Sequence, residues 1–162
     1  MLRTAVTATA AVAILAVSAP LGQAAPAGPV DAADRTSTVR EFTVASGTRW
    51  AVCTARAEAP RWSRSAGSVV YTTRVTCRGN INRVRVRVVG RLVRSGSGTV
   101  ATSDEFKVIT TNGGTATYDT PRGGAKVRRP GTFRGASTVQ ITAPVRGTRG
   151  TTSSKAQYVR VP

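Results

Sequence analysis

Apolar and charged side chains alternate along residues 82–94 of this chain. Successive side chains of a β-strand point to opposite faces of a sheet, so the pattern predicts a strand with one buried and one solvated face. A helix would scatter the same charges around its circumference. The apolar parity holds Val84, Val86, Val88 and Leu92, and the other parity holds an arginine row of Arg83, Arg85, Arg87 and Arg91.

A period of two also occurs along residues 49–58 and 68–78. Gly, Pro and Asn between the candidate strands supply the dihedral angles that turns require. Short strands separated by turns predict an all-β protein, and we expect an antiparallel β-sandwich of seven to nine strands. Weaker strand candidates are residues 99–103, 106–111, 115–120, 126–129, 137–142 and 157–161, and turn signals are residues 95–98, 112–114, 121–124, 130–131 and 147–150.

The first 24 residues have the pattern of a signal peptide. Arg3 gives a positive start, residues 5–17 are uncharged and mostly apolar, and small residues precede a cleavage site that we place after Ala24. The apolar run is shorter than the roughly 20 residues that a membrane span needs. We therefore expect a secreted, extracellular protein whose signal forms a helix, with a retained N-terminal anchor as the alternative.

The remaining chain divides into a leader and one domain. Residues 25–40 contain Pro, small residues and two acidic residues without an apolar period, which predicts a disordered leader. Residues 41–162 show no break in composition, so we expect one β-sandwich domain there.

Cys53 and Cys77 are the two cysteines of the chain. An even pair in an exported protein predicts one disulfide. Both cysteines share the apolar parity of their strands, but the sequence leaves open whether the bond joins neighbouring strands or crosses between sheets. Without His or a third Cys, we expect neither a metal site nor a cofactor.

The chain carries 24 basic and seven acidic residues. Loss of the signal would remove Arg3 and leave a formal charge of 23 − 7 = +16. Such a charge keeps a monomer soluble and attracts polyanions. Secretion would expose the protein to cell-wall polymers and acidic polysaccharides rather than to genomic DNA. No amphipathic helix is expected, so we predict no membrane insertion.

Groups for catalysis are scarce in this sequence. Nucleophile systems that depend on His cannot form, because the chain has none. Asp104 and Glu105 are adjacent and would point to opposite faces of a strand, whereas a glycosidase needs two carboxyls facing each other. Nearby arginines also favour the ionised carboxylate. We expect a non-enzymatic protein whose acids pair locally with Arg.

The arginine row is the main candidate for a polyanion-binding site. Its neighbouring side chains would lie about 6.6–7 Å apart on one strand face. If residues 68–78 pair with this strand through a turn at residues 79–80, Arg74 and Arg78 join that face. Like charges side by side cost stability, and an anionic polymer that binds them would release counterions. The alternative is a solvated strand face in an Arg-rich protein.

A second candidate lies in the predicted loop of residues 58–67, where Arg61 and Arg64 flank Trp62. An exposed Trp can stack on a sugar or a base while the guanidiniums hold acidic groups. The alternative is a Trp that folds down and caps the end of the core.

The Ala-rich exported start, the cysteine pair and residues 131–135 ahead of a late strand resemble short secreted actinobacterial β-rich proteins of unassigned function, with an immunoglobulin-like sandwich. Antibody-type domains differ, since their cysteines lie much further apart and bracket a core Trp. The resemblance implies a fold and carries no function with it.

Taken together, these patterns favour a secreted protein that binds cell-envelope polymers or acidic polysaccharide electrostatically. The alternative is a protein-interaction module, such as an inhibitor, toxin or adhesion partner, whose charge serves only solubility.

Overall fold

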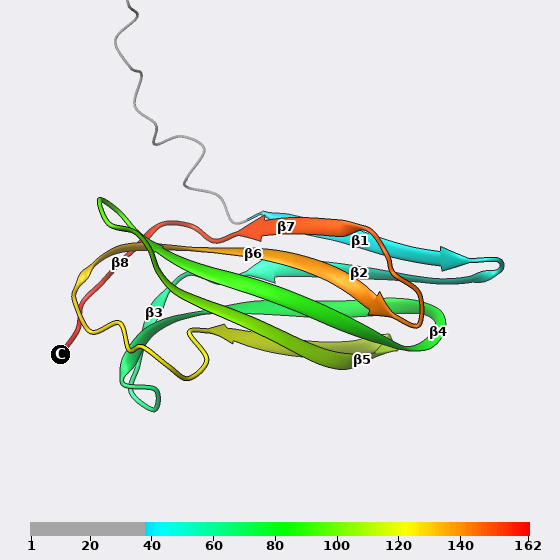
Figure 1. Ribbon diagram of the computed structural model, residues 1–162, viewed down its shortest axis with the longest axis horizontal. Helices are drawn as coiled ribbons and strands as arrows, with labels where there is room; N and C mark the ends of the chain where they lie inside the picture. The colour runs from blue at the N-terminus through cyan, green and yellow to red at the C-terminus, as the bar shows by residue number, and fades with distance from the viewer. Residues whose placement is uncertain (1–37) are drawn as a thin grey trace, which may run out of the picture.

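The computed structural model describes residues 38–162, in which all regular structure is β (Figure 1). Eight strands form one antiparallel sheet, which confirms the predicted all-β class. The strands are β1 (Val39–Ser46), β2 (Arg49–Ala57), β3 (Arg61–Ser63), β4 (Ser68–Arg94), β5 (Gly98–Thr120), β6 (Gly131–Ala143), β7 (Arg149–Ser153) and β8 (Gln157–Val159).

The predicted signal peptide and most of the predicted leader lie outside the described residues. β1 begins at Val39, so the last two residues assigned to the leader belong to the first strand. Thr38 also bonds to β7 through its backbone, with 2.9 Å between its N and the O of Ser153. Residues 38–40 therefore belong with the β-strands and not with the predicted leader.

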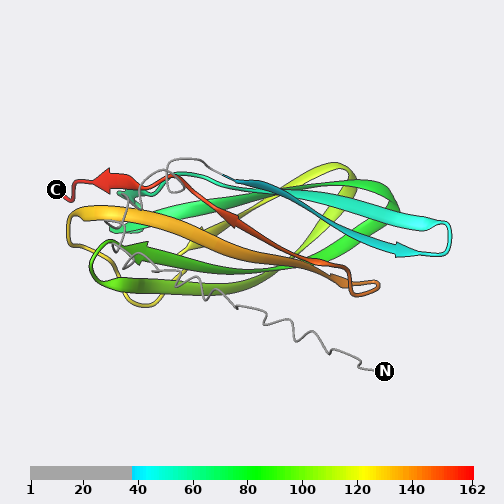
Figure 2. The same cartoon turned by 90° about the horizontal axis from the view of Figure 1, so that it is seen from above.

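β4 and β5 form one long hairpin that folds back on itself (Figures 1 and 2). Both strands reverse direction at the same end of the molecule, where the register of the ladder shifts between Arg78 and Arg83. The reversal divides β4 into a first arm, residues 68–78, and a second arm, residues 83–94. The sequence predicted these arms as two separate strands.

The residues at the reversal contact β2 instead of forming a hairpin turn. Asn80 Oδ1 accepts a hydrogen bond from Trp50 N at 2.6 Å, and Asn80 Nδ2 donates to Thr48 O at 2.8 Å. A Cβ atom on Gly79 would lie 2.3 Å from Trp50 O, so glycine is required for this close approach of the two backbones.

Each arm of β4 has its own neighbours. The first arm pairs with β2 and with the C-terminal half of β5, whereas the second arm pairs with β6 and with the N-terminal half of β5. The expected pairing of the two arms through residues 79–80 is therefore wrong. Among the described residues, β7 extends the sheet beyond β6, and β1 lies beside β7.

Buried side chains from both arms form two core clusters, a larger one and a smaller one that holds Leu92 and Tyr71. The predicted alternation is confirmed, because the four apolar residues of the second arm are at most 1% exposed and the four arginines are exposed. Val75 and Cys77 come from the first arm and pack into the larger cluster. The cluster also includes Phe42, Val44, Ala51, Cys53, Ala55, Ile81, Val84, Val86, Val88, Ile109, Tyr118, Val139 and Ile141.

Several predicted boundaries differ from the structure. The candidates 99–103, 106–111 and 115–120 are one continuous strand, and residues 126–129 are not a strand. The predicted turn at residues 147–150 overlaps the start of β7, because Arg149 and Gly150 already belong to that strand.

Cys53 and Cys77 form the predicted disulfide, and the structure shows that it joins neighbouring strands. The two residues lie directly opposite each other in the β2–β4 ladder, with their Cα atoms 4.1 Å apart. Both are fully buried. The bond therefore fixes the register of β2 against the first arm from inside the core.

Tyr71 connects the first arm to the second arm and to β6. Its hydroxyl donates to Ala136 O at 2.7 Å, accepts from Arg91 N at 3.0 Å and lies 2.8 Å from Ser137 Oγ. A Cβ on Gly135 would lie 2.2 Å from the Tyr71 ring, so the ring packs directly on the β6 backbone. This tyrosine holds the folded hairpin closed.

Reduction of the disulfide is expected to lower the free energy of unfolding by about 3 kcal/mol, because the unfolded chain regains the entropy of an open loop. Urea denaturation with and without reductant measures the difference. The C53A/C77A double variant should be insensitive to reductant. Equal stability of oxidised and reduced wild-type protein would contradict this role.

Tyr71→Phe is expected to lower the free energy of unfolding by about 1–3 kcal/mol, because buried polar partners lose their hydroxyl. Tyr118→Phe is the matched control, since the Tyr118 hydroxyl donates one 3.3 Å bond, to Val86 O. We expect a smaller loss for that variant in the same denaturation assay. A loss for Y71F no larger than that for Y118F would show that Tyr71 does not link the arms.

Candidate arginine face

The arginine row lies on the outer side of the second arm, as the alternation predicted. Cross-strand register gives each arginine its neighbours, so that Arg85 lies opposite Val108 and Arg87 lies opposite Phe106 on β5. On the other flank, Gln140 of β6 lies opposite Arg87. We use the name arginine face for the row together with the outward residues of β5, β6 and β7 beside it.

The β5 flank of the arginine face is apolar. Phe106 is 44% exposed and Val108 is 63% exposed. The guanidinium carbons of Arg85 and Arg87 lie 4.5 and 5.4 Å from the centre of the Phe106 ring, which is cation–π geometry. The ring lies against two like charges and offsets part of their repulsion.

The outward position of Phe106 was not predicted from the sequence. A signal was present, because Phe106 and Val108 alternate with Glu105 and Lys107. In this part of β5 Phe106 and Val108 face outward, whereas Glu105 and Lys107 lie on the inner side. Inward charges are one way in which natural sheets protect an edge strand from pairing with other chains.

Asp104 is the carboxylate of the arginine face. Arg87 Nε donates to Asp104 Oδ1 at 2.8 Å, and Arg87 Nη2 donates to Oδ2. These hydrogen bonds hold the pKa of Asp104 below its usual range, and Asp104 raises the pKa of Arg87. The pair therefore persists at neutral and mildly acidic pH and opens as the pH falls below the usual carboxyl range. Both groups are exposed, so solvent screens the interaction.

Three members of the row, Arg83, Arg85 and Arg91, have no acidic partner among residues 38–162. Arg74 and Arg78 differ from them. Their partners are acids on other strands or loops, and they lie on the outer side of the first arm. The N–O distances are 3.1 Å from Arg74 to Glu58 and 3.6 Å from Arg78 to Glu41. Arg74 and Arg78 therefore do not extend the arginine row.

The predicted loop contact around Trp62 contains the short strand β3. Trp62 pairs with Val69 and packs against the core cluster that contains Tyr71, so its ring covers this end of the core. Arg61 forms an ion pair of 3.6 Å with Glu58, and Arg64 lies in the turn that follows β3. This arrangement favours the structural alternative for Trp62.

Arg149 was missed by the sequence analysis, which placed it in a turn. In the structure it lies on β7 opposite Gln140, which in turn lies opposite Arg87. The three residues form a row across three strands. Arg87, Arg91 and Arg149 border one hollow of about 200 Å³. Cross-strand register places Arg149 there, and local sequence pattern cannot supply that register.

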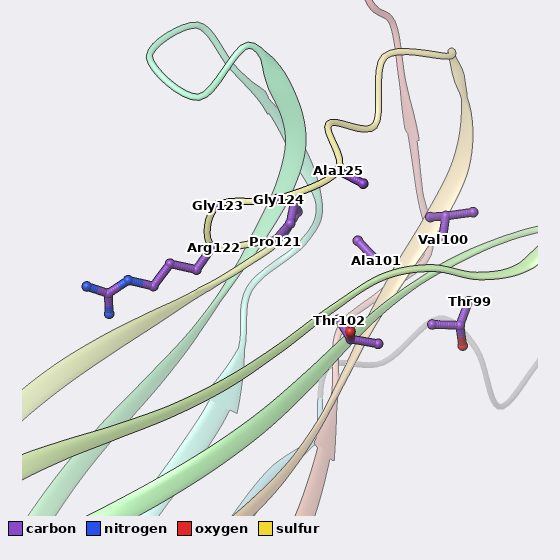
Figure 3. A pocket seen from close by; sticks show the side chains of 9 residues that line it. All are labelled: Thr99, Val100, Ala101, Thr102, Pro121, Arg122, Gly123, Gly124 and Ala125. Atoms are coloured by element: carbon purple, nitrogen blue, oxygen red, sulfur yellow. The ribbon is translucent and has the colours of Figure 1, made fainter.

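A separate hollow of about 490 Å³ lies between residues 99–102 and 121–125 (Figure 3). Small side chains surround it, and the Arg122 side chain extends away from it (Figure 3). The guanidinium of Arg122 pairs with the buried carboxylate of Glu105, which also lies 3.0 Å from Lys107 Nζ. Because none of its nine lining residues directs a charged group into it, this hollow offers less for recognition than the arginine face.

Comparison with known proteins gave no match to a family, to a curated protein or to a solved structure. Residues 38–162 contain no group of three metal-ligating side chains. They also contain no helix that could cross a membrane.

Asp104→Asn is expected to strengthen binding of heparin severalfold, because it removes the carboxylate of the face and releases Arg87. Asp119→Asn removes the same charge elsewhere, from a residue that accepts a hydrogen bond from Thr72. Fluorescence anisotropy at one fixed salt concentration compares the two variants. Equal gains from D104N and D119N would show that only net charge matters.

Proposed function

We propose that this protein is a secreted, non-enzymatic binder of extracellular polyanions, which it holds on the arginine face. The observation that carries the proposal is the placement of Arg83, Arg85 and Arg91 on one outer strand face without acidic partners in residues 38–162. Guanidiniums hold phosphate, sulfate and carboxylate groups bidentately. Their spacing along a strand suits a polymer with repeated anionic groups better than a single small anion.

The overall charge supports electrostatic binding. Residues 38–162 contain 22 basic and five acidic residues, a difference of 22 − 5 = 17. A field of this size raises the local concentration of polyanions, and each contact releases condensed counterions. Cell-envelope polymers and acidic polysaccharides are the expected partners.

The acidic residues support a role without catalysis. Each of the five acids in residues 38–162 already has a partner: four form ion pairs, and Asp119 accepts a hydrogen bond from Thr72. The hydrogen bonds from Arg87 hold the pKa of Asp104 below its usual range, so this carboxylate is a poor proton donor. The chain also has no His to serve as a general base.

The location and the finer architecture belong to the same proposal. A buried disulfide is compatible with an oxidising extracellular compartment, as expected after cleavage near Ala24. We infer that the folded hairpin makes an immunoglobulin-like sandwich, because each arm carries its own neighbouring strands and the buried faces of both arms share one core cluster.

A protein-interaction module is the second candidate function. The exposed Phe106 between Arg85 and Arg87 favours it, because aromatic residues and Arg are enriched where protein interfaces hold most of their binding energy. Such a partner would stay bound at high salt, whereas a polyanion held by counterion release would not.

The triple variant R83S/R85S/R91S is expected to bind heparin more weakly. The slope of log K against log salt should become shallower by about 2–3, because counterions are no longer released at the three lost contacts. The control variant R56S/R128S/R160S removes the same charge away from the arginine face. Titrations of both variants over a range of salt concentrations measure the slopes. Identical slopes for the two variants would overturn the assignment of the site. If the affinity of the wild-type protein for heparin does not depend on salt concentration, the result favours the protein-interaction module.

A further inference from the structure

A groove runs along the outer side of β6, between the second arm of β4 and β7. It consists of two hollows, of about 380 Å³ and about 200 Å³. Val89, Arg91 and Thr138 line both hollows, so the two are continuous. Neither hollow extends to Phe106 or Val108. The groove therefore borders the polar flank of the arginine row.

Side-chain length explains the shape of the groove. The floor is made of short residues that lie opposite one another, since Val89 pairs with Thr138 and Thr138 pairs with Thr151. Longer side chains surround that floor. The wall residues are Arg87, Arg91, Arg134, Arg149 and Gln140, with Arg40 at the β1 end.

The polar groups of the groove have a different chemistry from the arginine row. A guanidinium only donates hydrogen bonds, whereas a hydroxyl both donates and accepts them. The hydroxyls of Thr138 and Thr151 have no hydrogen-bond partner within residues 38–162. The adjacent buried hydroxyls are already used, because Ser137 bonds to Thr73 and Thr152 bonds to Thr38 O. The groove thus presents free donors and acceptors beside positive charge.

We propose that this groove seats a sugar unit of an acidic polysaccharide. The inference rests on the proposed function and specifies its ligand class. Hydroxyls of the sugar bond to Thr138 and Thr151, an acidic substituent lies between Arg91 and Arg149, and the apolar face of the ring packs on Val89. A volume of several hundred Å³ is in the range of small-molecule sites. Inorganic polyphosphate has neither hydroxyl-rich rings nor an apolar face, so it would bind through the row of charges alone.

Thr138→Ile tests the groove because it fills the floor without changing charge, and a β-branched residue suits the strand. The probes are a heparin octasaccharide and an inorganic polyphosphate of equal charge, measured at one ionic strength. We expect affinity for the octasaccharide to fall about tenfold and affinity for polyphosphate to change less than twofold. Thr138→Val removes only the hydroxyl, and we expect a loss of about threefold for the octasaccharide.

Thr102→Ile is the matched control. Thr102 lies opposite Arg91 on the β5 flank, so the variant adds the same bulk beside the same arginine but outside the groove. It should leave both affinities unchanged. Circular dichroism checks that each variant is folded. If T138I does not fold, T138V still tests the groove.

Three results would overturn the groove proposal: equal losses for both probes, no loss for either probe, or equal losses for T138I and T102I. If T138I loses as much affinity for oligo(dT) as for the octasaccharide, the proposal is also overturned. The groove would then bind any polyanion that contains rings. These outcomes are separable from the proposed function. Titration of R83S/R85S/R91S with polyphosphate in addition to heparin tests that function by itself, because polyphosphate does not need the groove.

Discussion

The buried faces of the two β4 arms pack against one core because the β4–β5 hairpin reverses direction between Arg78 and Arg83. Val84, Val86 and Val88 lie in the same buried cluster as side chains of the first arm. Burial of such side chains contributes roughly 1.5–3 kcal/mol each, so the reversal contributes to the stability of this part of the fold. Tyr71 and the disulfide then fix the positions of the strands around it. The outward direction of the arginine row is a direct consequence, since every residue between two buried valines must point to solvent.

The arginine face is an electrostatically unfavourable arrangement that the core stabilises. Like charges at this spacing repel one another, and the surrounding residues relieve only part of that repulsion. Arg87 has Asp104 as an acidic partner, and Phe106 lies against Arg85 and Arg87. The remaining positive charge stays available to a ligand. The first arm differs, because Arg74 and Arg78 are paired with Glu58 and Glu41. Two arms of one strand therefore have outer faces with different electrostatic character.

The two flanks of the arginine row offer different chemistry to a ligand. Phe106 and Val108 form an apolar flank on β5, whereas Thr138 and Gln140 form a polar flank on β6. A polymer that lies along the row can contact guanidiniums with its acidic groups and the polar flank with its hydroxyls. This asymmetry distinguishes the face from a uniformly charged surface, on which charge density alone would govern binding.

The sequence by itself determined the all-β class, the buried disulfide pair and the alternation of residues 82–94, because these depend on local period and on residue chemistry. Cross-strand register decided the rest. The sequence did not show that residues 68–94 are one strand, since the reversal at Gly79 depends on contact with Trp50 of β2. It gave no means of placing Arg149 in one cross-strand row with Gln140 and Arg87, because β4 is distant in the chain from β6 and β7. Strand period is local and is visible in the residues, whereas the pairing of strands is a property of the packed sheet, so only the tertiary structure assembled the arginine face and its groove.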